Sequence, residues 1–536
     1  MKKTIALALA AAMSLSLAAC GGGASTATST TVSSESTATA ASSTAEASST
    51  ATEATPLAGG TVNIPITDDP TTLQGWMMRN SNESVIAPVI YETLLAYDET
   101  GAPQPYLLES FEADAAALTY TMVVRDGITF QDGTPLDAEA VKWNLDYYKE
   151  NGVLTGSYFN YVDRVEVVDE KTVVVYMSSW DALFNYGLAR TCFICSPKSV
   201  ETLGPDGFNE APVGTGAFQV TKWVHGEGVY TEKYDGYWGG QPYLDGINFM
   251  IYSSTATQQA ALEVGDLDIM NLSGDAITAD ALAAKGYTMT SAAIPATGYT
   301  LCFNSKASSP LTDVRVRQAI AYAVDTDAIN QALLGGGKYG ASSTQWALAS
   351  STEYTDIPGY GYDIEKAKSL LAEAGYDQGF ELTINFQVGD FAKSVCQIIQ
   401  AELAEVGVTV TLNQVEVANY ANYLGEWEGI LFHPMGLSNG QFSQVAANMI
   451  PGARFGSETF LHDEKSVALI QEAVVSDAET MSKNLKDAVT VLFQDNVELY
   501  TVSITYATAA ITPKLHGNYG AVQQYHAAYH ELWKEA

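Results

Sequence analysis

The chain has 536 residues, with 26 Lys and Arg against 62 Asp and Glu, and a formal net charge of −36 at pH 7. Such an acidic surface repels phosphate backbones and anionic lipid, so we expect no nucleic-acid binding. Hydrophobic residues make up 47 % of the chain and only five residues are cysteine, which indicates a globular protein and excludes a disulfide-dense scaffold. Because one hydrophobic core stops growing at about 250–300 residues, we expect at least two lobes.

The first element in chain order is an export leader. Lys2 and Lys3 precede an apolar run over 5–17, which is shorter than the about 20 residues of a transmembrane helix and is typical of a signal peptide. The run ends in LAAC at 17–20, followed by three glycines. This sequence resembles the lipobox of bacterial lipoproteins, which implies a signal peptide over 1–19 and a lipid on Cys20. The alternative is an ordinary signal peptide that is cut after Ala19.

The segment 20–57 is predicted to be a disordered tether. From 24 to 55 it consists almost entirely of Ser, Thr and Ala and has no aromatic residue, so it cannot bury a core. We find no second stretch that is long and apolar enough to span a bilayer. The mature chain is therefore expected outside the cytoplasm, attached to the cell membrane by lipid alone.

The folded part is expected to begin near 58 and to alternate between strands and helices, which indicates an α/β fold. We predict strands over 61–66, 118–124 and 408–412, and two strands within 162–177 that are split by a turn at 169–171. Apolar stripes at helical spacing predict helices over 137–149, 314–324, 364–374 and 391–406. Asp137 is the expected N-cap of the first helix, and Thr312 or Asp313 caps the second.

Seven motifs in this order resemble the family 5 extracellular solute-binding proteins, the peptide- and nickel-type receptors of ABC importers. The motifs are 90–95 (IYETLL), 105–111 (PYLLESF), 124–143 (VRDGITFQDGTPLDAEAVKW), 212–218 (PVGTGAF), 311–325 (LTDVRVRQAIAYAVD), 362–376 (YDIEKAKSLLAEAGY) and 397–407 (QIIQAELAEVG).

The resemblance implies a two-lobed α/β body of the periplasmic-binding-protein type II kind, with an extra subdomain in the first lobe. Lobe I would combine 58–298 with 506–536, its subdomain would cover about 84–211, and lobe II would span 299–505. The chain would cross between the lobes at 300–304 and 501–506. A cleft between two such lobes can bury a solute and still open for exchange.

One segment departs from the pattern of the peptide-binding members. These members carry an aspartate in a Trp-x-x-Asp-Tyr-x-Asp-Pro-like segment, where it pairs with the ammonium group of the peptide. Here the segment 427–440 reads WEGILFHPMGLSNG and contains no aspartate, although Glu428 remains as an acid near its start. This departure weakens the expectation of a simple peptide-binding mode.

The candidate ligand contacts are aromatic and polar residues on segments expected to line the cleft. They are Trp76, Trp346, Trp427, His433, Met435, Asn439 and Tyr506. The alternative for each aromatic residue is ordinary core packing, and His433 could simply bond to a backbone carbonyl. One histidine without nearby Cys or His partners does not make a protein-only metal site, so we expect neither a bound metal nor a cofactor, although a metal chelate would need fewer protein ligands.

The sequence therefore predicts a monomeric, non-enzymatic binding lipoprotein that captures a small, peptide-like solute and delivers it to an ABC permease. A metal chelate, such as a nickel complex, is the alternative ligand within the same class. The alternative of another class is an extracellular hydrolase that uses acids such as Asp68, Asp69 and Glu428, although no motif places two of these acids together.

Overall fold

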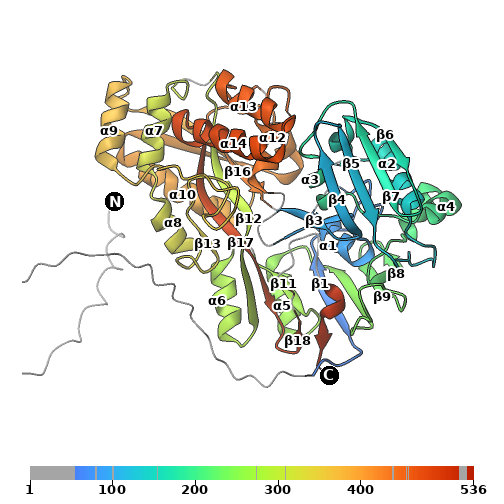
Figure 1. Ribbon diagram of the computed structural model, residues 1–536. Helices are drawn as coiled ribbons and strands as arrows, with labels where there is room; N and C mark the ends of the chain where they lie inside the picture. Colours follow the sequence, from blue (N-terminus) through green and yellow to red (C-terminus); the bar gives the residue numbers. More distant parts are fainter. Residues whose placement is uncertain are drawn as a thin grey trace, which may run out of the picture. The chain divides into compact units, whose positions relative to one another are not determined.

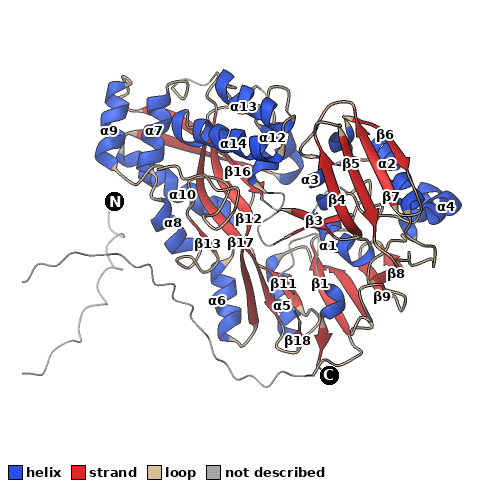
Figure 2. Cartoon of the chain, viewed as in Figure 1, coloured by secondary structure: helices blue, strands red, loops and turns tan. Residues whose placement is uncertain are grey.

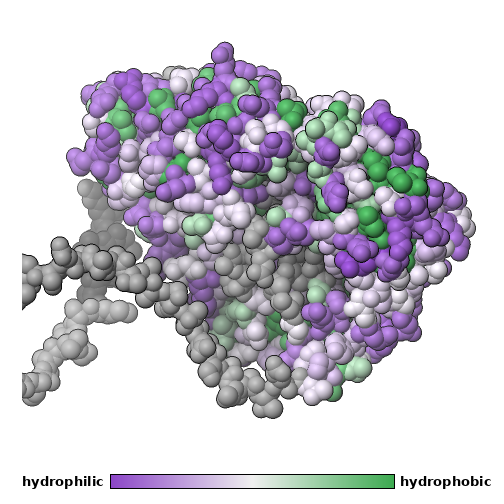
Figure 3. All heavy atoms as spheres, viewed as in Figure 1, coloured by the Kyte–Doolittle hydropathy of each residue, from purple (hydrophilic) through white to green (hydrophobic). Residues whose placement is uncertain are grey.

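The computed structural model describes residues 55–535 except for 79–80, 99–101, 154, 273, 308–309, 438–439, 454, 457, 518 and 520–527. All of them belong to Thr55–Ala536, the second of the two units into which the chain divides. The predicted leader, Cys20 and nearly all of the predicted tether lie outside the described residues. On the face shown in Figure 3 hydrophilic residues prevail, as the high content of acidic residues leads one to expect.

Three large sheets organise the folded unit (Figures 1 and 2). The first sheet, in spatial order, consists of β1 (Thr61–Ile66), β10 (Gly246–Ile251), β9 (Gly228–Lys233) and β8 (Phe218–Val224). The second consists of β4 (Leu108–Asp114), β5 (Thr119–Val124), β7 (Thr172–Met177) and β6 (Val162–Val167). The third has the order β11 (Ile269–Asn271), β17 (Leu499–Ile511), β12 (Thr288–Phe303), β16 (Ile430–Gly436), β14 (Phe380–Gln387) and β15 (Val408–Val415), and β13 (Gly340–Ala341) pairs with β17.

Two small ladders complete the strands of the described residues. They pair β2 (Leu95–Tyr97) with β3 (Pro103–Pro105) and β18 (Leu515–His516) with β19 (Trp533–Lys534).

The helices alternate with the strands, as the sequence predicts for an α/β fold. In the first part of the chain they are α1 (Ser81–Ile90), α2 (Ala138–Asn151), α3 (Phe184–Arg190), α4 (Pro197–Glu210), α5 (Thr255–Val264) and α6 (Ala276–Ala284). In the second part they are α7 (Val314–Ala323), α8 (Thr326–Leu333), α9 (Ile364–Glu373), α10 (Asp390–Glu405), α11 (Val417–Tyr420), α12 (Gln441–Asn448), α13 (Glu464–Val474) and α14 (Ala478–Val489). Single turns are η1 (Thr155–Phe159), η2 (Ala421–Tyr423), the π-helical η3 (Thr490–Asp495) and η4 (Tyr529–Glu531).

The capping predictions are confirmed at both helices for which they were made. The Asp137 side chain accepts a hydrogen bond from the backbone N–H of Ala140 at the start of α2. Of the two candidates before α7, Asp313 is the cap, because its carboxylate accepts from the N–H of Arg315. Such caps satisfy backbone donors that have no partner within the helix.

The predicted crossover strands are parts of much longer strands. β12 has 16 residues and β17 has 13, and the two pair in antiparallel fashion over most of their length. Their register shifts at Ser291/Pro295, Pro295/Thr297 and Tyr299/Thr300. An interrupted ladder bends and twists more than a regular one, and the boundary that we propose between the lobes, at 298 and 506, falls within this stretch.

Candidate ligand-binding site

The third sheet has two faces with different surroundings. Side chains alternate between the faces along each strand. In β16, Ile430 and Phe432 belong to an apolar cluster with residues of α7, α9 and α10. Leu431 and Met435 belong to a different cluster, with residues of α12, α13 and α14. We call these the α7 face and the α12 face; by the same alternation, His433 lies on the α12 face.

His433 and Trp427 meet on the α12 face through one aromatic ring. The ring of Phe455 lies 4.7 Å from that of His433 and 5.6 Å from that of Trp427, measured between centroids. The Trp427 indole N–H donates to the carbonyl of Cys302 on β12 at 3.1 Å. Trp427 is only 3 % exposed, so it forms the base of this aromatic group and not its open side.

The His433 imidazole is neutral at physiological pH. Burial lowers its pKa to about 3, because a charged imidazolium would lose its hydration. Its Nδ1 lies 2.8 Å from the hydroxyl oxygen of Tyr420, whose ring stacks on the imidazole. The residue is half-buried, and no hydrogen bond to its Nε2 is found among the described residues. A neutral imidazole with one free nitrogen can donate to, accept from or coordinate a ligand.

Trp346 and Met435 lie on the same face of the sheet. The Trp346 indole N–H donates to the hydroxyl of Thr300 on β12 at 3.0 Å, and its ring meets Phe493 edge to face. Met435 pairs with Gly298 of β12, where an added Cβ would lie 3.3 Å from Trp346. The α12 face thus gathers four of the predicted contacts, but Trp346 and Met435 are almost fully buried.

The other predicted contacts are not part of this group. Trp76 packs with Tyr147 of α2 and Phe208 of α4, at ring distances of 4.9 and 5.3 Å. Tyr506 lies on β17 opposite Pro295 and is half-buried. Asn439 lies outside the described residues. These three positions remain predictions.

A buried acid on the α12 face was missed in the sequence. Glu353 is 5 % exposed, and its Oε2 accepts a hydrogen bond from the N–H of Phe442 in the first turn of α12. Burial raises the pKa of Glu353 to about 7. Gln441 donates from its amide to the carbonyl of Glu353 and to Oε1 of Gln345. Glu353 stands in a polar loop without periodicity, so no local sequence signal marks it.

Two hydrogen bonds join the subdomain of the predicted lobe I to the end of α13. The indole N–H of Trp180 donates to the carbonyl of Ser476 at 2.7 Å, and the N–H of Ala182 donates to Val474 at 2.8 Å. Val474 is the last residue of α13, where carbonyls have no partner within the helix, and Ser476 follows just after it. Burial and the nearby Glu353 carboxylate raise the pKa of Tyr186 in α3, which places the subdomain close to the α12 face.

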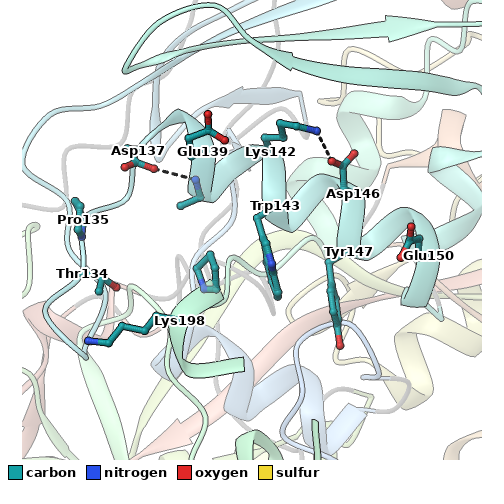
Figure 4. Close-up of a pocket in the computed structure, with 12 residues that line it drawn as sticks. Thr134, Pro135, Asp137, Glu139, Lys142, Trp143, Asp146, Tyr147, Glu150 and Lys198 are labelled. Carbon is teal, nitrogen blue, oxygen red and sulfur yellow. Dashed lines mark hydrogen bonds and ion pairs between the residues drawn. The ribbon is translucent and has the colours of Figure 1, made fainter. Parts of the chain in front are cut away.

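Two pockets are found away from this aromatic group. The larger, of about 550 Å³, lies against α2. Figure 4 shows Trp143 and Tyr147 pointing from one side of α2, whereas Glu139, Lys142 and Asp146 point from the opposite side. The rings of Trp143 and Tyr147 stack at 4.6 Å, and Trp76 packs on Tyr147. Trp76 therefore supports this pocket from the segment between β1 and α1, outside the predicted subdomain.

The second pocket has a volume of about 300 Å³ and lies between the loop that follows β13, the first turn of α8, and β17. Its residues include Phe493, whose ring also contacts Trp346. This pocket lies within the part of the chain that we assign to lobe II, and no sequence motif predicted it.

The acids of the hydrolase alternative are not brought together by any contact in the described part of the chain. Asp69 accepts hydrogen bonds from Trp223 and Gly226. Glu428 is exposed and follows the buried Trp427 in lobe II. Within the described ranges, no group of three or more His, Cys, Asp or Glu side chains is placed to hold a metal ion. None of the helices described there combines the length and apolar character needed to cross a membrane.

Residues 102–447 match the family described as bacterial extracellular solute-binding proteins, family 5. Among curated proteins, the glutathione-binding protein GsiB of Salmonella paratyphi A is 28 % identical over 371 residues, which cover 68 % of this chain and 71 % of GsiB.

Two solved structures show the same fold. The ABC transporter substrate-binding protein CtaP of Listeria monocytogenes superimposes with a TM-score of 0.79 at 22 % identity, over 89 % of this chain and 99 % of CtaP. NikA of Brucella suis, in complex with Fe(III)-EDTA, gives a TM-score of 0.79 at 22 % identity, over 89 % of this chain and all of NikA. The predicted two-lobed fold of the type II binding proteins is thereby confirmed. The chain belongs to family 5 of the bacterial extracellular solute-binding proteins and serves an ABC importer as its substrate-binding protein.

Proposed function

We propose that this chain binds a peptide-like solute with a free ammonium group, and that Glu353 is the carboxylate that receives this group. The observation that carries the proposal is the position of Glu353. A Cβ added at Gly440 would lie 2.6 Å from its Oε1, and Gly440 ends the segment in which the peptide-binding pattern has an aspartate. The acid would then be supplied by a different loop, beside the end of that segment.

The energetics of Glu353 support this role. Among the described residues it forms no ion pair, and the charge of Lys486 lowers its pKa less than its backbone hydrogen bonds do. A buried carboxylate without a counter-ion is costly, and it either takes up a proton or acquires a cation. An ammonium group would stabilise its charged form, and the attraction between the two ions would offset the cost of taking both out of water.

The comparisons agree with a peptide-like ligand. GsiB is named as a glutathione-binding protein, and glutathione is a small peptide with an ammonium group. Tyr186 of the subdomain lies near Glu353. A ligand held at Glu353 would therefore be covered from both proposed lobes. Lobe I comprises 58–298 with 506–536, and lobe II comprises 299–505.

A metal chelate is the second candidate ligand. The specific observation that favours it is the free Nε2 of the neutral His433 imidazole, which is the form that coordinates metals. NikA, which shares the fold, was solved with a bound iron chelate. The chelator would supply most of the metal ligands, because the described residues contain no metal-binding cluster of their own.

We also propose how the protein is attached to the cell and in which state it acts. The chain acts as a monomer, without enzymatic activity, and is tethered to the outer side of the cell membrane through a lipid on Cys20. The leader 1–19 is removed, and the segment 20–57 links the lipid to the folded part. The solute is passed to the permease when the lobes open.

A thermal-shift screen of the purified chain tests the ligand class. A ligand at a hundredfold excess over its Kd stabilises the folded state by about 2.7 kcal/mol. We expect glutathione and trialanine to raise the Tm, and the Glu353→Gln variant to lose this shift. If only the mixture of nickel and histidine raised the Tm, and His433→Phe lost this shift, the ligand would be assigned as a metal chelate and not as a peptide. No shift with any of these compounds would contradict both candidates.

A further inference from the structure

The pocket of about 300 Å³ in the predicted lobe II contains polar groups without partners. Thr501 of β17 lines it and is 1 % exposed, yet its Oγ1 has no hydrogen-bond partner among the described residues. The same is true of the buried Oγ1 of Thr344 on the opposite loop. A buried hydroxyl without a partner costs free energy, so two such groups at one cavity indicate that something else bonds to them.

The pocket is preformed by a close approach within its loop. Gly359 adopts a φ of +66°, and a Cβ at this position would lie 2.4 Å from Cγ2 of Thr344. The Gly359 N–H donates to Oε1 of Gln494 at 2.7 Å, and the Tyr360 hydroxyl donates to the carbonyl of Gln494 at 2.5 Å. These bonds hold the loop against η3, so the cavity does not depend on a ligand for its shape.

The lining selects against charged ligands. No Lys, Arg or His lines the pocket, and its one acid, Asp327, is exposed at the first turn of α8 and already accepts a hydrogen bond from Ser342. An anion would find no counter-charge there. The remaining lining residues are mainly hydroxyl-bearing and aromatic side chains, among them Tyr360, Phe493 and Tyr500.

Hydroxyl groups beside aromatic rings suit a molecule that has many hydroxyls and apolar C–H faces. The hydroxyls of Thr344 and Thr501 can each donate and accept, and the rings can pack against the C–H groups. We propose that the pocket is a second binding site, specific for a neutral polyhydroxylated molecule of about monosaccharide size, within the lower range of ligand-pocket volumes. It differs from the peptide site at Glu353, whose ligand carries charge, although Tyr354, next to Glu353, lines the pocket.

Ligand-observed saturation-transfer NMR on the purified chain tests this site with D-glucose, D-xylose and myo-inositol as probes. Each is titrated to about 20 mM, at which a site of millimolar affinity is mostly filled. We expect saturable binding of at least one probe that glutathione does not displace. A pocket that holds only water would give no saturable signal with any probe, and this result would overturn the proposal, as would displacement by glutathione.

Two matched variants on β17 separate binding from stability. Thr501→Val and Ser503→Ala each remove a buried hydroxyl without a partner from the same strand, but only Thr501 lines the pocket. Both are expected to raise the Tm of the free protein, which shows that they fold. Only Thr501→Val should weaken binding of the probe, with a Kd raised by about tenfold or more. Equal affinity in the two variants would overturn the proposal, whether or not the peptide site exists.

Discussion

The α7 face and the α12 face of the third sheet are built from different kinds of side chain. Ile384, Ile399 and Leu403 are fully buried on the α7 face, where the buried guanidinium of Arg317 in α7 is satisfied by backbone carbonyls such as that of Leu311. The α12 face contains apolar residues as well, but it also buries His433 and Glu353, both with strongly shifted pKa values. The first face stabilises lobe II, and the second keeps polar groups at a cost in stability, as expected where a protein binds a ligand.

The largest effect is expected on the α7 face. Ile399→Ala in α10 removes a side chain that is 0 % exposed and should lower the free energy of unfolding by about 2–5 kcal/mol. Urea unfolding followed by circular dichroism measures this loss. Ile399→Val should cost only about 0.5–1.5 kcal/mol. If Ile399→Ala changed ligand affinity more than stability, the division between the two faces would be wrong.

Glu353, on the α12 face, should make the folded protein less stable as the pH rises. Its pKa is raised to about 7 in the folded state, so between its ordinary pKa of about 4.5 and pH 7 the folded state binds more protons than the unfolded state. Its contribution is present in full below that range and is lost as the pH rises through 7. Between pH 4.5 and 8 the original protein should lose on the order of 3 kcal/mol of its free energy of unfolding through this group, and Glu353→Gln should not show this loss. Identical pH profiles of the two proteins would contradict the burial of this acid.

His433 should make the folded protein less stable as the pH falls, which is opposite to the effect of Glu353. Its pKa is lowered to about 3, so between about pH 3 and 6.5 the unfolded state binds more protons, and stability falls as the pH falls. Between pH 6.5 and 4.5 the loss should be about 2.5 kcal/mol and should be absent in His433→Phe. Chemical unfolding at these two pH values measures it. A variant that loses as much stability on acidification as the original protein would show that His433 is charged or solvated.

The smallest effect is expected for Trp346→Phe. The variant keeps an aromatic ring against Phe493 but loses the indole donor to Thr300, a change worth about 1 kcal/mol. Thermal unfolding measures it, and Trp427→Phe, which loses the bond to Cys302, provides the comparison. A loss above about 3 kcal/mol, the range of a large cavity, would mean that packing and not the hydrogen bond holds Trp346 in place.

The difference between the faces also explains what could be predicted from the sequence. The helices over 314–324, 364–374 and 391–406 were predicted to within a few residues, because apolar stripes and caps are local signals. Trp427 and His433 were found together because both belong to one short segment around β16. The grouping of Glu353 with Gln345 and Gln441 joins a loop to α12 across about 90 positions of the chain, and no local pattern encodes such a contact. The length of β12 and β17 was underestimated, because these strands continue beyond the predicted crossover.

A calorimetric titration of glutathione and trialanine into three forms of the purified chain tests the central claim most directly. The forms are the original protein, Glu353→Gln on the α12 face and Ile399→Val on the α7 face. We predict saturable binding to the original protein and to Ile399→Val with the same Kd, and at least about tenfold weaker binding to Glu353→Gln, the loss expected when a buried charge pair is broken. Equal binding by all three forms, or none by the original protein, would contradict the assignment of the ligand site to Glu353.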